Sequence, residues 1–167
     1  MRFRFSRNPS IEIEAIETPD QNFTDFDKVL QILFDKGHIA IDVFGASGKE
    51  QDHFLGNLNT AIEWKEKLKI VFFDNHGSYF LADKKITIKD CKHKTISLVP
   101  FPKAKEITTK GLQYLLNKED LVFGKRIGTR NKAIENEVAI DNSVVFILTT
   151  SDCFVILSFK SSISSFV

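Results

Sequence analysis

A thiol and an imidazole lie two residues apart in this chain, at Cys91 and His93, and three lysines surround them: Lys89, Lys92 and Lys94. Neighbouring cations favour the thiolate, which is the nucleophilic form of cysteine. On a strand, residues two apart point to the same face, so the pair fits a catalytic dyad or two ligands of a metal. The sequence shows no orienting acid for a dyad and no further ligands at zinc spacing. A polar connecting segment is therefore favoured, and neither a catalytic residue nor a metal site is predicted.

The turn at residues 44–50 (FGASGKE) is a second candidate, because it follows an apolar run and precedes a helical pattern. A glycine-containing turn that opens a helix presents backbone N–H groups to an anion. A Walker loop, however, needs four residues between its glycines and Ser or Thr after its lysine. Here two residues separate Gly45 from Gly48, and Glu50 follows Lys49. The sequence therefore favours helix capping, with Ser47 and Glu50 as a capping box.

Charge is sorted along the chain. Residues 1–83 have 9 Lys/Arg and 14 Asp/Glu, residues 84–132 have 13 and 4, and residues 133–167 have 1 and 4. The near-neutral total of +1 thus hides a basic segment of net charge +9 between two acidic ones. Such an arrangement concerns partners and solubility rather than the fold.

The basic segment, residues 84–132, is the main candidate for a partner surface. It has few aromatic residues on which bases could stack, and only 2 of its 13 cations are arginine, the better reader of phosphates and bases. A protein partner is therefore favoured over nucleic acid, and pairing with the protein's own acidic residues, or simple solvation, is the plain alternative. The residues predicted to bind a partner are Lys84, Lys85, Lys125, Arg126, Arg130 and Lys132.

Length and composition bound the remaining possibilities. A chain of 167 residues with 43% hydrophobic residues can build one core of its own, so we predict a single domain over residues 1–167, with a frayed tail at 161–167. The N-terminus lacks an apolar run of signal-peptide length, and the longest apolar stretches are too short to cross a bilayer. The two cysteines lie far apart and do not suggest a disulfide framework. We expect a cytoplasmic protein without cofactor or membrane contact.

The elements that must position these residues follow from periodicity. Alternation predicts two strands within residues 1–16, and helical spacing predicts helices over 24–36 and 48–67. Strands over 39–43 and 70–73 complete a βαβ unit near residues 38–74, which implies a parallel pair. A turn at 74–77, strands at 79–82, 86–88 and 96–99, and a third helix at 106–117 follow. Residues 120–136 are ambiguous, and residues 144–149 and 153–159 predict an antiparallel hairpin of buried strands.

These patterns predict an α+β fold: a mixed, largely antiparallel sheet with about three helices and one βαβ unit. For function, the lack of a catalytic constellation favours a non-enzymatic protein-binding module, such as an immunity protein that neutralises a toxin through an acidic surface of that toxin. A nucleic-acid-binding accessory protein that uses residues 84–132 is the alternative. A small thiol-dependent enzyme around Cys91 and His93 ranks third.

Overall fold

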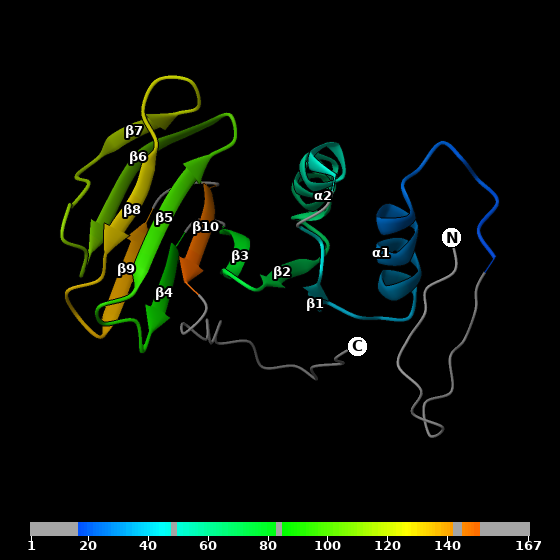
Figure 1. Ribbon diagram of the computed structural model, residues 1–167, viewed down its shortest axis with the longest axis horizontal. Helices are drawn as coiled ribbons and strands as arrows, with labels where there is room; N and C mark the ends of the chain where they lie inside the picture. Colours follow the sequence, from blue (N-terminus) through cyan, green and yellow to red (C-terminus); the bar gives the residue numbers. More distant parts are fainter. Residues whose placement is uncertain (1–16, 48–49, 83–84, 142–144, 151–167) are drawn as a thin grey trace.

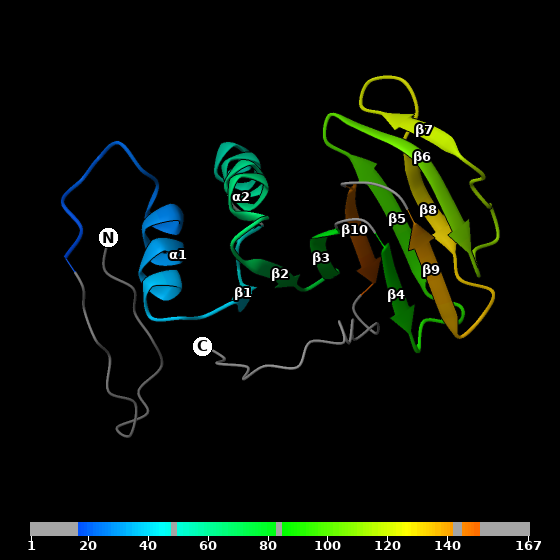
Figure 2. The same cartoon turned by 180° about the vertical axis from the view of Figure 1, so that it is seen from behind.

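The computed structural model of the chain describes residues 17–47, 50–82, 85–141 and 145–150. Within these ranges it contains two helices and ten strands, arranged in two sheets. Both helices lie at one end of the molecule and strands β4 to β9 at the other (Figure 1), as the reverse view in Figure 2 also shows. The predicted strands within residues 1–16, the second arm of the predicted hairpin at 153–159 and the predicted tail at 161–167 lie outside the described residues.

Helix α1 (Asp25–Asp35) confirms the helix predicted over residues 24–36. Thr24 caps it, because its hydroxyl accepts a hydrogen bond from the backbone N–H of Asp27 at 3.1 Å. Asp25 and Asp27 lie in the first turn, where negative charge stabilises the positive end of the helix dipole. Gly37 follows with a positive φ of 88°, as expected for a residue that ends a helix.

The predicted βαβ unit is confirmed. Strand β1 (Ala40–Phe44) pairs in parallel with strand β2 (Lys69–Asp74), and helix α2 (Gln51–Trp64) connects them. The predicted capping box at the start of α2 is wrong. The N-cap residue is Glu50, whose side chain makes no capping hydrogen bond, and the Ser47 hydroxyl donates instead to Asp74.

The parallel pair is one end of a six-stranded sheet with the order β1-β2-β3-β10-β5-β8. Strand β3 (Gly77–Ala82) forms the predicted tight hairpin with β2, in which Asp74 lies opposite Gly77. Strand β10 (Val145–Thr150) lies between β3 and β5 (Thr95–Pro100), and β8 (Gly128–Lys132) lies at the far end. The prediction that β10 is a central, buried strand is confirmed, and both of its edges are occupied by β3 and β5.

The second sheet has four strands in the order β4-β9-β6-β7. They are β4 (Lys85–Lys89), β9 (Glu137–Asp141), β6 (Lys103–Lys110) and β7 (Glu119–Val122). The third predicted helix, over residues 106–117, is wrong, because its first part belongs to β6. The predicted fold class is therefore correct as α+β, whereas the described residues contain two helices instead of about three.

The core is divided by the six-stranded sheet, and β10 contributes to both sides. Phe146 packs in a cluster with Leu30, Trp64 and Phe72, on the side of the two helices. Its neighbours Val145 and Ile147 point the other way, into a cluster with residues of the four-stranded sheet, including Ile88, Ile107, Val138 and Ile140. Alternation along one apolar strand therefore joins the two parts of the molecule. No helix of the described chain is both long and apolar enough to cross a membrane.

Candidate functional site

The carboxyl ends of the two parallel strands form the first part of the site. In α/β units, ligands commonly bind beyond the carboxyl ends of parallel strands, where connecting loops and helix N-termini converge. Strand β1 ends at Phe44 and leads through residues 45–47 toward α2, and strand β2 ends at Asp74. The two strand ends are in contact, since the rings of Phe44 and Phe73 stack with centroids 5.1 Å apart.

Asp74 holds the turn after β1 against the end of β2. Its Oδ2 accepts a hydrogen bond from the Ser47 hydroxyl at 2.8 Å. Its Oδ1 accepts from the backbone N–H groups of His76 and Gly77, at 2.7 and 3.0 Å. Burial raises the pKa of this carboxyl, but the hydrogen bonds from Ser47, His76 and Gly77 together outweigh burial, so the pKa lies below its ordinary value. Asp74 is therefore an ionised acceptor rather than a proton donor at neutral pH.

Tyr79 on β3 lies beside this carboxylate. Its ring is buried, stacks on Phe72 with centroids 4.7 Å apart and meets Phe54 of α2 edge-on. Burial and the negative charge of Asp74 raise the pKa of Tyr79 to about 12. Its buried hydroxyl makes no hydrogen bond of good geometry among the described residues, but it lies close enough to the Ser47 hydroxyl for that group to lower its pKa against the larger effect of burial. The Ser47 hydroxyl thus lies between the Asp74 carboxylate and the Tyr79 hydroxyl.

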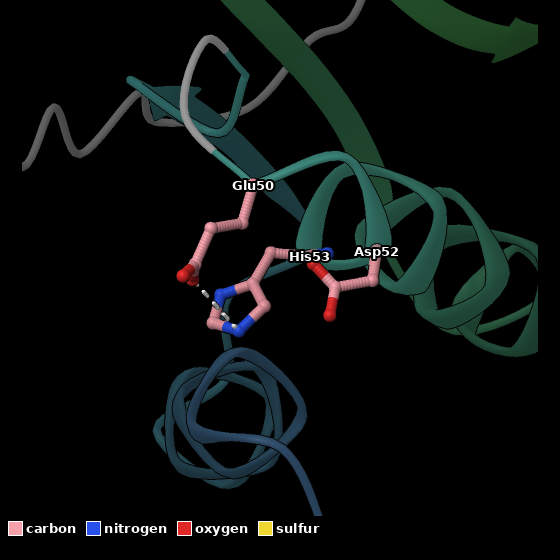
Figure 3. Close-up of side chains that lie close together, drawn as sticks. All are labelled: Glu50, Asp52 and His53. Atoms are coloured by element: carbon pink, nitrogen blue, oxygen red, sulfur yellow. Dashed lines mark hydrogen bonds and ion pairs between the residues drawn. The ribbon is translucent and has the colours of Figure 1, made fainter.

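Three exposed side chains lie close together at the start of α2: Glu50, Asp52 and His53 (Figure 3). Their ligand atoms all lie within 4.8 Å of one another, and Nε2 of His53 is 3.4 Å from Oε2 of Glu50. Among the described residues, this is the group that could hold a metal ion. Two carboxylates can contribute to Mg²⁺ binding, whereas an imidazole is more typical of transition metals.

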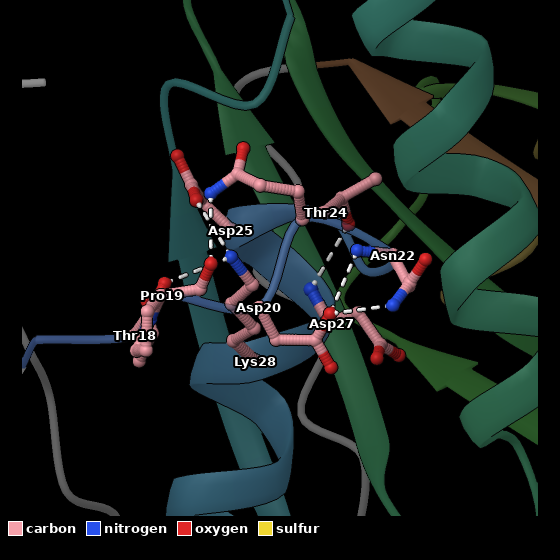
Figure 4. Close-up of polar contacts among 9 residues, drawn as sticks. Thr18, Pro19, Asp20, Asn22, Thr24, Asp25, Asp27 and Lys28 are labelled. Carbon is pink, nitrogen blue, oxygen red and sulfur yellow. Dashed lines mark hydrogen bonds and ion pairs between the residues drawn. The ribbon is translucent and has the colours of Figure 1, made fainter.

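The segment before α1 is a compact polar turn (Figure 4). Oδ1 of Asp20 accepts hydrogen bonds from both the backbone N–H and the side-chain amide of Asn22, at 2.8 and 2.9 Å. Lys28 donates to the carbonyl of Thr18 at 3.2 Å. Asp27 accepts from the indole N–H of Trp64 at 2.6 Å, which ties α1 to α2. These contacts are structural.

A shallow depression of about 210 Å³ is lined by Asp74 and by residues of the strands that follow β2 in the six-stranded sheet. Its walls come from the neighbouring strands β2, β3, β10, β5 and β8 of the six-stranded sheet and from the β2–β3 turn, and they are rich in hydroxyl groups. Arg130 lies at the β8 side, with a positive φ of 57° and its backbone N–H donating to the Ser97 hydroxyl at 2.9 Å. The residues that give it its polarity and its apolar wall are Asp74, His76, Thr95, Ser97, Arg130 and Leu148.

The structure does not place the predicted partner-binding residues together as unpaired cations. Lys85 forms an ion pair with Asp141 at 3.5 Å, and the Arg126 guanidinium pairs with the carboxylate of Glu119. Arg130 lines the depression, Lys125 and Lys132 are exposed, and Lys84 lies outside the described residues. A partner-binding role for these six residues stays a prediction.

The favoured interpretation of Cys91 and His93, a polar connecting segment, agrees with their placement. Cys91 is fully buried, and its Sγ lies 3.4 Å from the carbonyl oxygens of Ile88 and Asn136. His93 is exposed and has a positive φ of 69°, so the two residues do not share the face of a strand. A buried thiol in hydrogen-bond contact with carbonyls is not available as a nucleophile.

Comparison with known proteins gives a consistent result. Residues 5–72 match the family model of the thiamin pyrophosphokinase catalytic domain, and residues 84–151 match that of the thiamin pyrophosphokinase vitamin B1 binding domain. Thiamine pyrophosphokinase of Bacillus subtilis is 28% identical over 121 residues, which cover 70% of this chain and 56% of the relative. Thiamine pyrophosphokinase 1 of Oryza sativa subsp. japonica is 28% identical over 148 residues, covering 81% and 55%. The chain thus spans about half the length of these relatives.

Solved structures agree. The Bacillus subtilis thiamine pyrophosphokinase superposes with a TM-score of 0.71 and 25% identity, covering 80% of this chain and 65% of that one. The thiamin pyrophosphokinase of Geobacillus thermodenitrificans superposes with a TM-score of 0.70 and 20% identity, covering 81% and 66%. In sequence and fold the chain is therefore similar to a family of enzymes. The matched models and relatives are those of the thiamin pyrophosphokinases.

These matches overturn the functional predictions from sequence. The predicted non-enzymatic module, its identity as an immunity protein and its toxin partner are wrong, because both family models and the relatives describe an enzyme. The alternatives, a nucleic-acid-binding protein and a thiol-dependent enzyme, are also not supported by these matches. The sequence lacks a recognisable catalytic motif, and that absence does not exclude catalytic chemistry.

The sequence reasoning also missed the residues that the structure brings together. In the sequence, Asp74 and His76 indicate only a turn, and His53 carries no signal of a role. A usable signal was present, since two predicted parallel strands end next to polar residues, at Ser47 and at Asp74. Because the carboxyl ends of parallel strands meet at one edge, this pattern predicts a shared site.

Proposed function

We propose that this chain takes part in thiamin pyrophosphokinase chemistry, the transfer of a diphosphoryl group from a nucleoside triphosphate to the hydroxyl group of thiamin. The observation that carries the proposal is the pair of matches in one chain: a catalytic-domain model is followed, in order, by a vitamin B1 binding-domain model of the same enzyme. The relatives in Bacillus subtilis and Oryza sativa support the same activity.

The parallel-strand edge supports binding of the triphosphate. Helix α2 begins there, and its N-terminal backbone N–H groups and dipole favour phosphate. The Glu50 and Asp52 carboxylates in the same place would repel bare phosphates. They suit a Mg²⁺ ion that arrives with the nucleotide, because such ions are held by one or two carboxylates together with substrate phosphates. When bound, the ion would neutralise charge on the phosphates.

The depression next to Asp74 supports binding of the acceptor. The match to the vitamin B1 binding domain includes Thr95, Ser97, Arg130 and Leu148, all of which line it. Hydroxyl groups over an apolar wall suit an aromatic heterocycle with polar substituents. Asp74 borders both the depression and the β1–α2 turn, so an acceptor bound here would lie close to the triphosphate.

The chemistry required of the protein is mainly positioning. The acceptor hydroxyl oxygen attacks the β-phosphorus, the bond from that phosphorus to the α–β bridging oxygen breaks, and the nucleoside monophosphate leaves. The hydroxyl proton is released to solvent or to a nearby acceptor. Phosphoryl transfer depends on alignment and charge stabilisation more than on covalent help from the enzyme.

The purified chain is to be incubated with ATP, Mg²⁺ and thiamin, and its nucleotide products separated by chromatography. We expect AMP and thiamin diphosphate to accumulate in equal amounts, because a diphosphoryl group moves as a unit. Formation of ADP would indicate single phosphoryl transfer instead. The absence of thiamin-dependent AMP at enzyme concentrations up to ~10 μM, far above those at which a typical turnover of ~10 per second is detectable, would refute the proposal for this chain.

A matched pair of variants separates the site from general effects on the helix. Asp52→Asn removes a carboxylate from the first turn of α2, and Glu63→Gln removes one from its last turn, where Glu63 accepts a hydrogen bond from Asn59. We expect kcat/KM to fall at least ~10-fold in Asp52→Asn and to stay within ~2-fold in Glu63→Gln, since electrostatic contacts to the reacting groups contribute on this scale.

A further inference from the structure

The described turn after β1, residues 45–47, is fixed by few contacts, and most of them lead to the end of β2. The backbone N–H of Gly45 donates to the carbonyl of Phe73 at 3.4 Å, which is a long hydrogen bond. The carbonyl of Ala46 accepts from the Asn57 side chain at 3.0 Å. The short side-chain contact is the 2.8 Å hydrogen bond from the Ser47 hydroxyl to Asp74. Asp74 is itself held by two backbone N–H groups of the tight β2–β3 turn.

The direction of this hydrogen bond has a chemical consequence. A serine hydroxyl has one proton and two lone pairs. Because the carboxylate of Asp74 can only accept, the Ser47 proton is committed to it. The Ser47 oxygen therefore meets other groups as an acceptor, and the neighbouring Tyr79 hydroxyl can occupy one of its two lone pairs. It can receive an O–H or N–H of a ligand, and it has no proton to offer to a phosphate oxygen.

We infer that Asp74 is a positioning residue, which holds Ser47 at the carboxyl edge of β1 and β2 as a hydrogen-bond acceptor for an O–H or N–H of the acceptor substrate. The identity of that substrate rests on the proposed function, whereas the fixing of the turn by Asp74 does not. Ser47 is half-buried and Asp74 lines the depression, so the pair lies between the triphosphate edge and the acceptor depression.

The positioning can be tested without any activity. Amide hydrogen exchange is to be measured in the wild-type chain, in Ser47→Ala, in Asp74→Asn and in the double variant. Each single variant should speed exchange of the amides at residues 45–47 by at least ~10-fold, and the double variant should add little, because both changes remove one interaction. The control is Asp27→Asn, which weakens the comparable hydrogen bond from Trp64 between α1 and α2 and should leave exchange at residues 45–47 unchanged.

Steady-state kinetics test the acceptor role. Ser47→Ala should raise KM for thiamin by ~3–10-fold, the value of one ordinary hydrogen bond, and change KM for ATP by less than ~2-fold. Ser47→Thr keeps the hydroxyl and should restore most of the loss. Asp27→Asn should lower stability without moving either KM.

The outcomes distinguish the two proposals. Unchanged exchange at residues 45–47 in both single variants, or fully additive effects in the double variant, would overturn the positioning role, whether or not the chain is active. A rise in KM for ATP instead of thiamin would overturn the acceptor role of Ser47. A wild-type chain without thiamin-dependent AMP formation would refute the proposed function, and with it the acceptor identity, while the exchange data would still decide the role of Asp74.

Discussion

At the scale of single residues, the Asp74 carboxylate accepts hydrogen bonds on both oxygens, from Ser47 on one side and from the N–H groups of His76 and Gly77 on the other. A turn residue of this kind normally satisfies only its own backbone. Here the second oxygen also ties a neighbouring loop to the strand end. The buried Tyr79 hydroxyl lies beside this pair and also interacts with Ser47.

The pH dependence of stability follows from the lowered pKa of Asp74. A carboxyl whose pKa is lower in the folded than in the unfolded protein stabilises the fold above the unfolded pKa, near ~3.9, and loses that stabilisation as pH falls through the folded pKa. The free energy of unfolding of Asp74→Asn should therefore lie below that of the wild type at pH 7. The two values should converge toward pH 3 and below, as the wild-type carboxyl becomes protonated.

Urea titrations at pH 7 and pH 3 measure this difference. Asp35→Asn is a suitable control, because Asp35 is exposed and accepts one hydrogen bond from Gln31 within α1. Its effect should be small at both pH values. A deficit of Asp74→Asn that is equally large at pH 3 would show that the loss comes from packing or backbone geometry rather than from the ionised carboxylate.

At the scale of elements, Gly111 explains why residues 106–117 form no helix. It has a positive φ of 79°, and a Cβ built on it would lie 2.3 Å from the carbonyl oxygen of Glu137. The glycine ends strand β6 where the chain passes close to β9. Gly111→Ala should therefore destabilise the protein by ~2 kcal/mol or more, through both the backbone conformation and the clash.

Gly56 offers the opposite case within one chain. It lies inside α2, and a Cβ built on it would meet nothing within 4 Å. Gly56→Ala should stabilise the protein by ~0.5–1 kcal/mol, the ordinary difference in helix propensity. Thermal or urea unfolding of both variants measures the two effects. Equal effects of the two substitutions would contradict the close approach of β6 and β9.

Elements with a strong period or clear caps were predictable from the sequence. Helix α1 has its apolar face and its Thr24 cap, and the βαβ unit has apolar runs of the right length. Strand β6 was not predictable, because Ile107 and Leu112 fit a helical face, and the decisive contact of Gly111 with β9 lies 26 residues away along the chain. The capping box failed for the same reason, since Ser47 finds a tertiary partner 27 residues away that outcompetes its local one.

The site was less predictable than the fold. Arg130 was singled out as a partner-binding residue because of its charge, and the structure places it in the wall of the depression. Nothing in the local sequence indicates that Ser97 on β5 and Asp74 on β2 lie at the same depression. Their convergence depends on the position of β10, which is inserted between β3 and β5 from the far end of the chain.

At the scale of the whole molecule, one continuous sheet connects the two parts that match different domain models. Strands β1 and β2 lie in or near the catalytic match, and β10, β5 and β8 lie in the vitamin B1 binding match, with β3 between them. The two halves of the proposed site are therefore held by a shared hydrogen-bond ladder rather than by a flexible connection. The prediction of a single domain over residues 1–167 stays a prediction.

The charge of the basic segment, residues 84–132, is partly compensated by acidic residues that the fold brings near it. Folding brings acidic side chains beside some of its cations: Lys85 pairs with Asp141, Lys89 with Glu137 and Lys103 with Asp120, at 3.5, 3.4 and 2.9 Å. Two of these acids come from the acidic segment that follows residue 132. Exposed pairs of this kind contribute little to stability, but they lower the positive potential that a polyanion would meet.

The ion pairs of Lys85, Lys89, Lys103 and Arg126 should weaken heparin binding, so we expect the whole chain to elute from a heparin column below ~150 mM salt. A double variant, Glu137→Gln with Asp141→Asn, frees Lys89 and Lys85 and should elute at higher salt than the wild type. The control is Glu63→Gln with Asp35→Asn, which changes the net charge equally but on the exposed sides of α2 and α1. If both double variants elute at the same salt, net charge alone governs binding and the local pairing of the basic segment is irrelevant. Retention of the wild type well above ~150 mM would show that the segment still presents a surface that binds polyanions.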